Sequence, residues 1–176
     1  KQLKAELSLA EIEEALIAMV AAELKAGGWI DLAPLLSAGR HAITGSWRVR
    51  GGTVACASRS ASRGRSITMP ARPTGNYRFA VSFRIPQNGI ASIYLPVPPD
   101  RRVVWACSGK GKTGIGPIDG VEWHEKRNRT GRVVSPFKPG GVHTFEAQVF
   151  SRAGTAGVEI TIDGRRVIRW RGRLSS

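Results

Sequence analysis

Cysteine is scarce in this sequence, and long apolar runs are missing. The two cysteines, Cys56 and Cys107, could form one bridge at most. This excludes a small secreted scaffold held by several disulfides and a zinc site closed by thiolates. No apolar run approaches the roughly 18 residues that a bilayer crossing needs, so we expect no membrane span. The histidines, at His41, His124 and His143, are scattered with no pair at ligand spacing, so we expect no metal site, and no motif demands a cofactor.

Acidic residues are also few: 13 Asp and Glu stand against 27 Lys and Arg, a formal net charge of +14. Residues 1–28 hold three Lys and five Glu, so the excess positive charge belongs entirely to the remainder of the chain. A basic surface attracts anions, namely nucleic acid, acidic polysaccharide, anionic lipid or an acidic protein. A solubilising surface without a specific ligand is the plain alternative, and charge alone does not choose among these.

The first segment, residues 1–28, has the pattern of one amphipathic helix. Ser8-Leu9-Ala10-Glu11 forms a capping box, and Gly27-Gly28 provides a stop. Between them, apolar residues recur at spacings of three and four and so share one face, namely Leu9, Ile12, Leu16, Met19, Val20 and Leu24. This face needs a partner, which is the rest of the domain, a second copy of the chain, or a longer coiled segment upstream.

From Trp29 the sequence changes to short runs in which apolar and polar residues alternate. This pattern predicts one β domain over residues 29–176. Apolar and polar residues alternate over 77–85, 144–149 and 158–163, which predicts half-buried strands. Asp163-Gly164 between two such runs predicts a two-residue type I′ hairpin. Its second arm places Ile168 and Trp170 on one side and arginines on the other. Roughly eight to ten such strands favour a mostly β fold, a two-sheet antiparallel jelly-roll sandwich behind the leading helix.

Ala106–Thr113 satisfies a relaxed phosphate-loop pattern, Ala-Cys-Ser-Gly-Lys-Gly-Lys-Thr. Such a loop works only when a helix begins at its Lys-Thr pair and points backbone N–H groups and the helix dipole at the phosphates. Here the chain continues Gly114-Ile115-Gly116-Pro117, which is unsuited to a helix. The pattern therefore does not predict nucleotide hydrolysis.

The stretch Asp119–Glu125 is the densest group of functional side chains. It invites comparison with glycosidases, but Glu122 and Glu125 on one strand would point to opposite faces and could not act as a pair. We expect instead a loop or strand edge where Trp123 stacks on a ligand and Glu125 and Asn128 make hydrogen bonds. Trp123 as a core or rim aromatic with solvated acids is the equally weighted alternative. No catalytic triad can be assembled, and we expect no catalytic residue.

The start of the β region contains Trp29–Leu32, Gly45–Val54 and Asn76–Phe83, and these segments resemble the opening of bacterial concanavalin A-like domains. Its end contains Gly141–Phe145 and Val158–Val167, which are similar to the closing strands of laminin G-like and 3-keto-disaccharide hydrolase-like domains. Asn88-Gly89-Ile90 fits an element of the hydrolase-like group, but residues 91–97 hold no acid where its active carboxylate is expected. The resemblance therefore implies a non-catalytic binding member of that fold, appended to a larger bacterial protein.

Three hypotheses follow. The first is a carbohydrate-binding or adhesion module, with a glycan contacted by Tyr94, Trp105, Trp123, Glu125 and Asn128. The second is a nucleic-acid or polyanion binder, which would use the basic side chains Arg59, Arg63, Arg65, Lys110, Lys112, Lys126, Arg127, Arg129, Arg132, Arg165, Arg166, Arg169, Arg171 and Arg173. The third is an assembly subunit that contacts a protein partner through the leading helix. A sugar-processing hydrolase of the same fold is the remaining alternative.

Overall fold

Antiparallel strands dominate the computed structural model, and the described part of the chain contains β1 to β12. The structure describes residues 14–15, 18–19, 22, 28–56, 66–97, 101–133, 137–138, 140–152 and 155–173. The chain forms two compact units, residues 1–72 and 73–176. No helix in the described ranges is long and apolar enough to cross a membrane.

The first unit contains short elements. Residues 14–15, 18–19 and 22 are helical and exposed, while the rest of the helix predicted within 1–28 lies outside the described residues. After these come η1 (Ala33–Leu35), α2 (Ala38–His41), the pair β1 (Ala42–Thr44) with β4 (Ser66–Ile67), and the pair β2 (Trp47–Arg50) with β3 (Thr53–Cys56). Residues 29–72, which we had expected inside the sandwich domain, thus form two-stranded sheets of their own.

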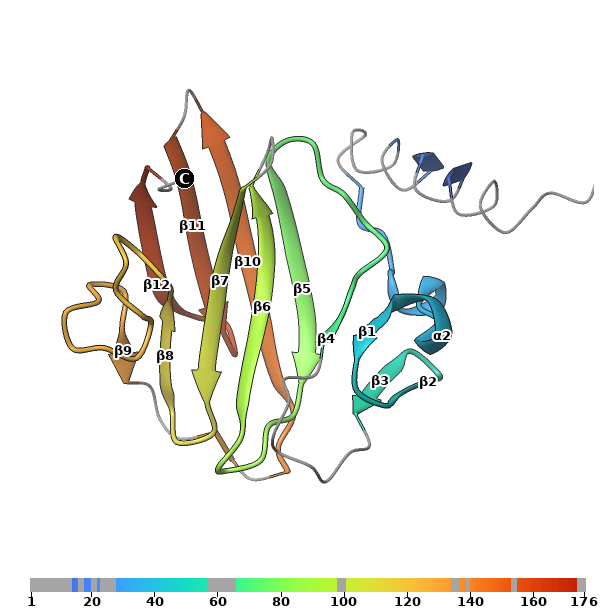
Figure 1. The fold of residues 1–176 in the computed structure, drawn as a ribbon, viewed down its shortest axis with the longest axis horizontal. Helices are drawn as coiled ribbons and strands as arrows, with labels where there is room; N and C mark the ends of the chain where they lie inside the picture. The colour runs from blue at the N-terminus through green and yellow to red at the C-terminus, as the bar shows by residue number, and fades with distance from the viewer. Residues whose placement is uncertain are drawn as a thin grey trace, which may run out of the picture. The chain divides into compact units, whose positions relative to one another are not determined.

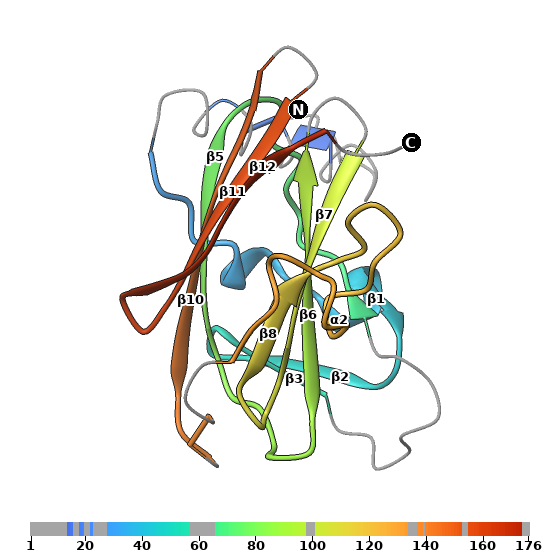
Figure 2. The same ribbon diagram turned by 90° about the vertical axis from the view of Figure 1, so that its left-hand side faces the viewer.

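The second unit is a β-sandwich, which confirms the predicted fold class. One sheet has the order β12-β11-β10-β5 and consists of β5 (Tyr77–Phe83), β10 (His143–Arg152), β11 (Thr155–Ile162) and β12 (Arg165–Gly172). The other has the order β6-β7-β8-β9 and consists of β6 (Ile90–Val97), β7 (Arg101–Ser108), β8 (Lys112–Ile115) and β9 (Arg132–Val133). Figure 1 shows the second sheet in front of the first, and Figure 2 shows the two layers edge-on.

The core lies between these sheets, as the alternation predicted. Phe145, Val149 and Ile160 come from one layer, Trp105 and Leu95 from the other, and all are at most 1% exposed. The rings of Trp105 and Phe145 lie with their centroids 4.5 Å apart. Full burial of a large apolar side chain contributes about 1.5–3 kcal/mol, so this layer of contacts is the main source of stability.

The predicted hairpin between β11 and β12 is confirmed. Asp163 and Gly164 have φ angles of 51° and 74°, the left-handed values that a type I′ turn requires. Beyond the turn, Ile168 is buried and Trp170 half-buried, whereas the arginines on the opposite side of β12 are exposed. The sequence pattern therefore also predicted the orientation of this strand.

Candidate binding face

The outer face of the sheet β6-β7-β8-β9 carries an exposed aromatic ring beside a cation. Alternation along β6 turns Tyr94 outward, and its side chain is 57% exposed. Arg102 of β7 lies with its guanidinium carbon 5.2 Å from the centroid of the Tyr94 ring. At this distance the positive charge is attracted to the electron-rich face of the ring. The pair thus offers a flat apolar surface and a positive charge together.

A structured loop, residues 116–131, joins β8 to β9 and lies against the same face. Figure 2 shows it on the side of β8 that is turned away from the other sheet. A Cβ placed on Gly114 would lie 2.8 Å from the Trp123 carbonyl oxygen, and one on Gly116 would lie 2.5 Å from the Trp123 nitrogen. Only glycine permits so close an approach of loop backbone to strand. Gly114 and Gly116, which argue against a phosphate-binding helix, therefore allow the backbone of this loop to pack on the strand.

The loop is built from successive turns. Ile118 and Val121 pair across Asp119 and Gly120, whose φ angles are 51° and 73°. Three turns follow in which the N–H groups of Glu125, Asn128 and Gly131 donate to the carbonyls three residues earlier. The loop predicted for this stretch is confirmed, and its backbone hydrogen bonding gives it a defined shape.

Asn128 is a structural residue of this loop, and its amide is not free to make the hydrogen bonds to a ligand that the sequence analysis predicted. It is 6% exposed. Its Nδ2 donates to the carbonyls of Ile115 and Val121 at 2.7 and 3.1 Å, and its Oδ1 accepts from the Thr130 N–H and hydroxyl at 2.9 and 2.6 Å. Every hydrogen-bonding direction of the amide is used inside the protein.

Trp105 is also a structural residue, and its ring lies in the core instead of at the surface, where the sequence analysis predicted a stacking role. Its side chain is fully buried, and the indole N–H donates to the Thr113 hydroxyl at 2.7 Å. That hydroxyl in turn donates to the Ala106 carbonyl. Trp105 occupies an inward position of β7, between the sheets, where its ring packs on Phe145 and Phe83. Its large apolar area is used for the core rather than for a ligand.

Glu125 lies in the loop with its carboxylate engaged by its neighbours. One oxygen accepts from the Glu122 N–H at 2.9 Å, and the other lies 3.3 Å from the Arg127 guanidinium. These hydrogen bonds hold the pKa of the Glu125 carboxyl below its usual value. Trp123, beside it, is half-buried, and its ring meets that of His124 edge-on at 5.5 Å. Of the five residues predicted for a glycan, Tyr94 is exposed on this face, and Trp123 is half-buried in its loop.

The phosphate-loop pattern is a hairpin between β7 and β8. Lys112 begins strand β8, which pairs antiparallel with β7, so no helix follows the glycines. Lys112 is half-buried, and its ammonium donates to the carbonyl of His124, which ties the loop to the strand. Lys110 is exposed at the turn.

The two outer faces of the sandwich differ in how their cations are compensated. On the sheet β12-β11-β10-β5, Arg78 lies 3.6 Å from Glu146, while Arg166 and Arg169 lie 3.6 and 3.7 Å from Glu159. The sequence has no Asp or Glu from 32 to 99 or from 101 to 118, so β6, β7 and β8 contain no carboxylate. Cations on the face of these strands are therefore not neutralised by acids of the same strands.

The basic side chains predicted for a polyanion separate into groups. Lys110, Lys126, Arg127, Arg129 and Arg132 are exposed on or near the loop. The arginines at 165, 166, 169, 171 and 173 are exposed along β12 and just beyond it, and Arg171 lies over the Phe150 ring at 4.9 Å. Arg59, Arg63 and Arg65 lie outside the described residues.

Arg102 is the functional candidate that sequence reasoning missed. It reaches Tyr94 only because β6 pairs with β7 in a register that sets Tyr94 opposite Val104 and Pro96 opposite Arg102. No local motif signals this neighbourhood, although the Arg101-Arg102 pair at a strand start is visible in the sequence. No group of three metal-ligating side chains occurs within the described ranges.

Comparison of the chain with protein-family models, with curated proteins and with solved structures gave no match. The resemblance to concanavalin A-like domains therefore stays a prediction. The geometry of the face is the basis for a functional proposal.

Proposed function

We propose that the second unit is a non-catalytic binding domain for an acidic polysaccharide, contacted by the outer face of β6-β7-β8-β9 and the 116–131 loop. The observation that supports it is the stacked pair of Tyr94 and Arg102 on strands that contain no carboxylate. An aromatic face takes the apolar side of a sugar ring, and a guanidinium pairs with its carboxylate or sulfate.

The extent of the face favours a polymer over a single sugar. Tyr94 lies opposite Val104, whose carbonyl accepts from the Gly116 N–H at 3.0 Å, and Trp123 lies directly on Gly116. Two strand spacings, about 10 Å, thus separate Tyr94 from the loop. A chain of several sugar units would contact both aromatic positions at once.

A non-catalytic role is supported by the state of the carboxylate at this face. Glu125 is already hydrogen-bonded to Glu122 and Arg127 within its own loop. A general acid needs a carboxyl whose pKa is raised toward neutral, whereas the pKa of Glu125 is lowered.

Single-stranded nucleic acid is the second candidate, because stacking aromatics beside cations also suit bases and phosphates. The exposed arginines of β12 favour it. Its affinity should fall linearly on a log–log plot against salt, with a slope near −0.7 per phosphate contacted. Tight binding of oligothymidylate with that slope, and none of polyuronate, would replace the first proposal by this one.

The test is affinity for polygalacturonate, with neutral dextran as the uncharged comparison. In the full chain, we expect Tyr94→Ala combined with Arg102→Gln to weaken polygalacturonate binding about tenfold or more, the combined effect of a lost stack and a lost charge. Arg152→Gln is the matched control, since Arg152 is an exposed cation at the end of β10 in the other sheet. Equal losses from both variants, or equal affinity for dextran, would contradict the proposal.

A further inference from the structure

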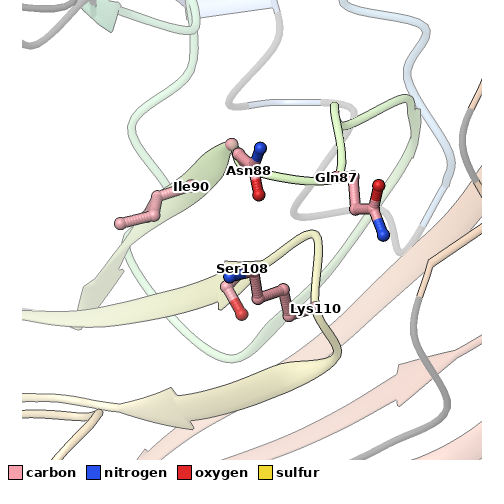
Figure 3. Close-up of a pocket in the computed structure, with 6 residues that line it drawn as sticks. Gln87, Asn88, Ile90, Ser108 and Lys110 are labelled. Atoms are coloured by element: carbon pink, nitrogen blue, oxygen red, sulfur yellow. The ribbon is translucent and has the colours of Figure 1, made fainter.

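A pocket of about 210 Å³ lies at one end of the same sheet, between two turns. Gln87, Asn88 and Gly89 come from the turn that leads into β6, and Ile90 begins that strand. Ser108 and Lys110 come from the hairpin between β7 and β8. Figure 3 shows the two turns facing each other with these side chains around the space between them.

The backbone of the pocket is fixed by interlocked turns. The Gly109 N–H donates to the Gly89 carbonyl at 2.9 Å, and the Gly89 N–H donates to the Pro86 carbonyl at 2.8 Å. A Cβ at Gly109 would lie 2.1 Å from the Pro86 oxygen, so the two turns approach as closely as glycine allows. Such a site is formed before its ligand arrives, which reduces the entropy lost on binding.

The lining combines an ammonium group, two carboxamides and a hydroxyl with an apolar wall, Ile90, and no carboxylate. Carboxamides and a hydroxyl can donate to and accept from sugar hydroxyls, and the ammonium of Lys110 can pair with an anion. The nearest stretches of sequence add no acid, since none occurs from 32 to 99 or from 101 to 118. This set of groups suits a ring that bears hydroxyls and one negative charge.

We propose that this pocket binds the terminal hexuronate unit of a polysaccharide, an inference that rests on the function proposed above. The volume of about 210 Å³ is below the 300–1,000 Å³ typical of sites for larger ligands, so it has room for one sugar ring. Ile90 and Tyr94 are exposed on the same side of β6 and lie four residues apart, about 13 Å along the strand. The pocket therefore takes the end of a chain whose next units extend toward Tyr94.

The experiment is an NMR titration of the ¹⁵N-labelled full chain with D-glucuronate, D-glucose or acetate. We expect glucuronate to shift the amide signals of residues 87–90 and 108–111. Glucose and acetate should bind with at least tenfold lower affinity. Lys110→Gln should weaken glucuronate binding about tenfold, since a charge-assisted hydrogen bond is lost. The control is Lys138→Gln, because Lys138 is an exposed lysine elsewhere in the second unit. This variant should keep the affinity for glucuronate within twofold of the wild type.

Three outcomes would overturn the inference: equal binding of glucose, equal binding of acetate, or glucuronate shifts that avoid both turns. A fold defect in Lys110→Gln is detected in its own spectrum, and Ser108→Ala then serves as the second variant. The two proposals fail separately. Polygalacturonate binding that is sensitive to Tyr94 and Arg102 but unaffected by free glucuronate would refute the pocket alone, whereas pocket shifts without polymer binding would refute the binding face.

Discussion

Single polar side chains hold the candidate loop where backbone pairing stops. Between β8 and β9 the chain has an isolated bridge and turns, and the carbonyls of Ile115 and Val121 accept hydrogen bonds from a side chain there, Val121 in addition to the Ile118 N–H. Asn128 donates to both, and the Thr130 hydroxyl accepts from the Ile115 N–H at 2.9 Å. A buried amide of this kind determines the path of a loop because each unmade bond costs free energy.

We predict that Asn128→Ala lowers the free energy of unfolding by about 2–4 kcal/mol, because the Ile115 and Val121 carbonyls and the Thr130 N–H each lose a hydrogen bond. Urea unfolding followed by tryptophan fluorescence measures it. Gln148→Ala, an exposed amide on β10, is the control and should change stability by less than 0.5 kcal/mol or so. A similar small effect for both variants would show that Asn128 is not a structural residue.

A second residue-scale prediction concerns Asp163, at the β11–β12 turn. Hydrogen bonds from His143, 2.8 Å away, and from the Thr144 N–H hold the pKa of the Asp163 carboxyl below its usual value. The stabilisation of the folded state by the Asp163 carboxylate is therefore complete above the unfolded-state pKa of about 3.9. It is lost as pH falls through the lower folded-state pKa. Asp163→Asn, which keeps the turn residue type, should be less stable than the wild type at pH 6, with a smaller deficit at pH 2.

The control for this comparison is Asp119→Asn, because Asp119 precedes a glycine in a turn with the same φ of 51°. Thermal unfolding at a series of pH values should show little difference between Asp119→Asn and the wild type at any pH. If the deficit of Asp163→Asn were the same at pH 2 and pH 6, the carboxylate would not be its source.

At the scale of elements, contact between β8 and the loop depends on glycines. We predict that Gly114→Ala displaces the loop, since its new methyl group would meet the Trp123 carbonyl at 2.8 Å. The cost should be about 1–3 kcal/mol in unfolding free energy, together with faster hydrogen exchange in residues 118–131. Gly75→Ala, whose added methyl group would meet nothing within 4 Å, is the matched control. Unchanged hydrogen exchange in residues 118–131 would mean that packing of the loop on β8 does not depend on Gly114.

The strands of the two sheets use their outward positions differently. In β10 and β11 these positions hold Glu146 and Glu159, which pair with arginines across the sheet. Such exposed pairs contribute little stability, but they neutralise that face locally. In β6 and β7 the outward positions hold Tyr94 and Arg102 with no acid on either strand. The acids on β10 and β11, and their absence from β6 and β7, thus distinguish the two faces.

At the scale of the whole molecule, the net charge of +14 should act mainly on the rate of association. We predict that raising salt from 50 to 200 mM lowers the association rate constant for polygalacturonate severalfold, with a smaller change in the dissociation rate constant. Surface plasmon resonance on immobilised polymer measures both. An effect of salt confined to dissociation would point to a few local ion pairs in place of long-range attraction.

The sequence by itself determined much of the sandwich, because alternation of apolar and polar residues follows from strand geometry alone. It predicted strands over 77–85, 144–149 and 158–163 and the Asp163-Gly164 turn, which the structure confirms, with β5 ending at Phe83, and of the loop or strand edge predicted around Trp123 the structure has a loop. Short strands between 29 and 72 also alternate, but only tertiary pairing decided that they form sheets apart from the sandwich.

Which functional side chains are available was decided by the tertiary structure. Trp105 and Tyr94 look alike in the sequence, yet one lies inside the sandwich and the other outside, because a strand has two faces and only its partner sheet determines which is buried. The amide of Asn128 donates to the carbonyls of Ile115 and Val121 instead of being free for a ligand. No local sequence pattern places these carbonyls beside it. The positive charge could be predicted from composition. Which arginines pair with acids depends on strand register, a long-range property.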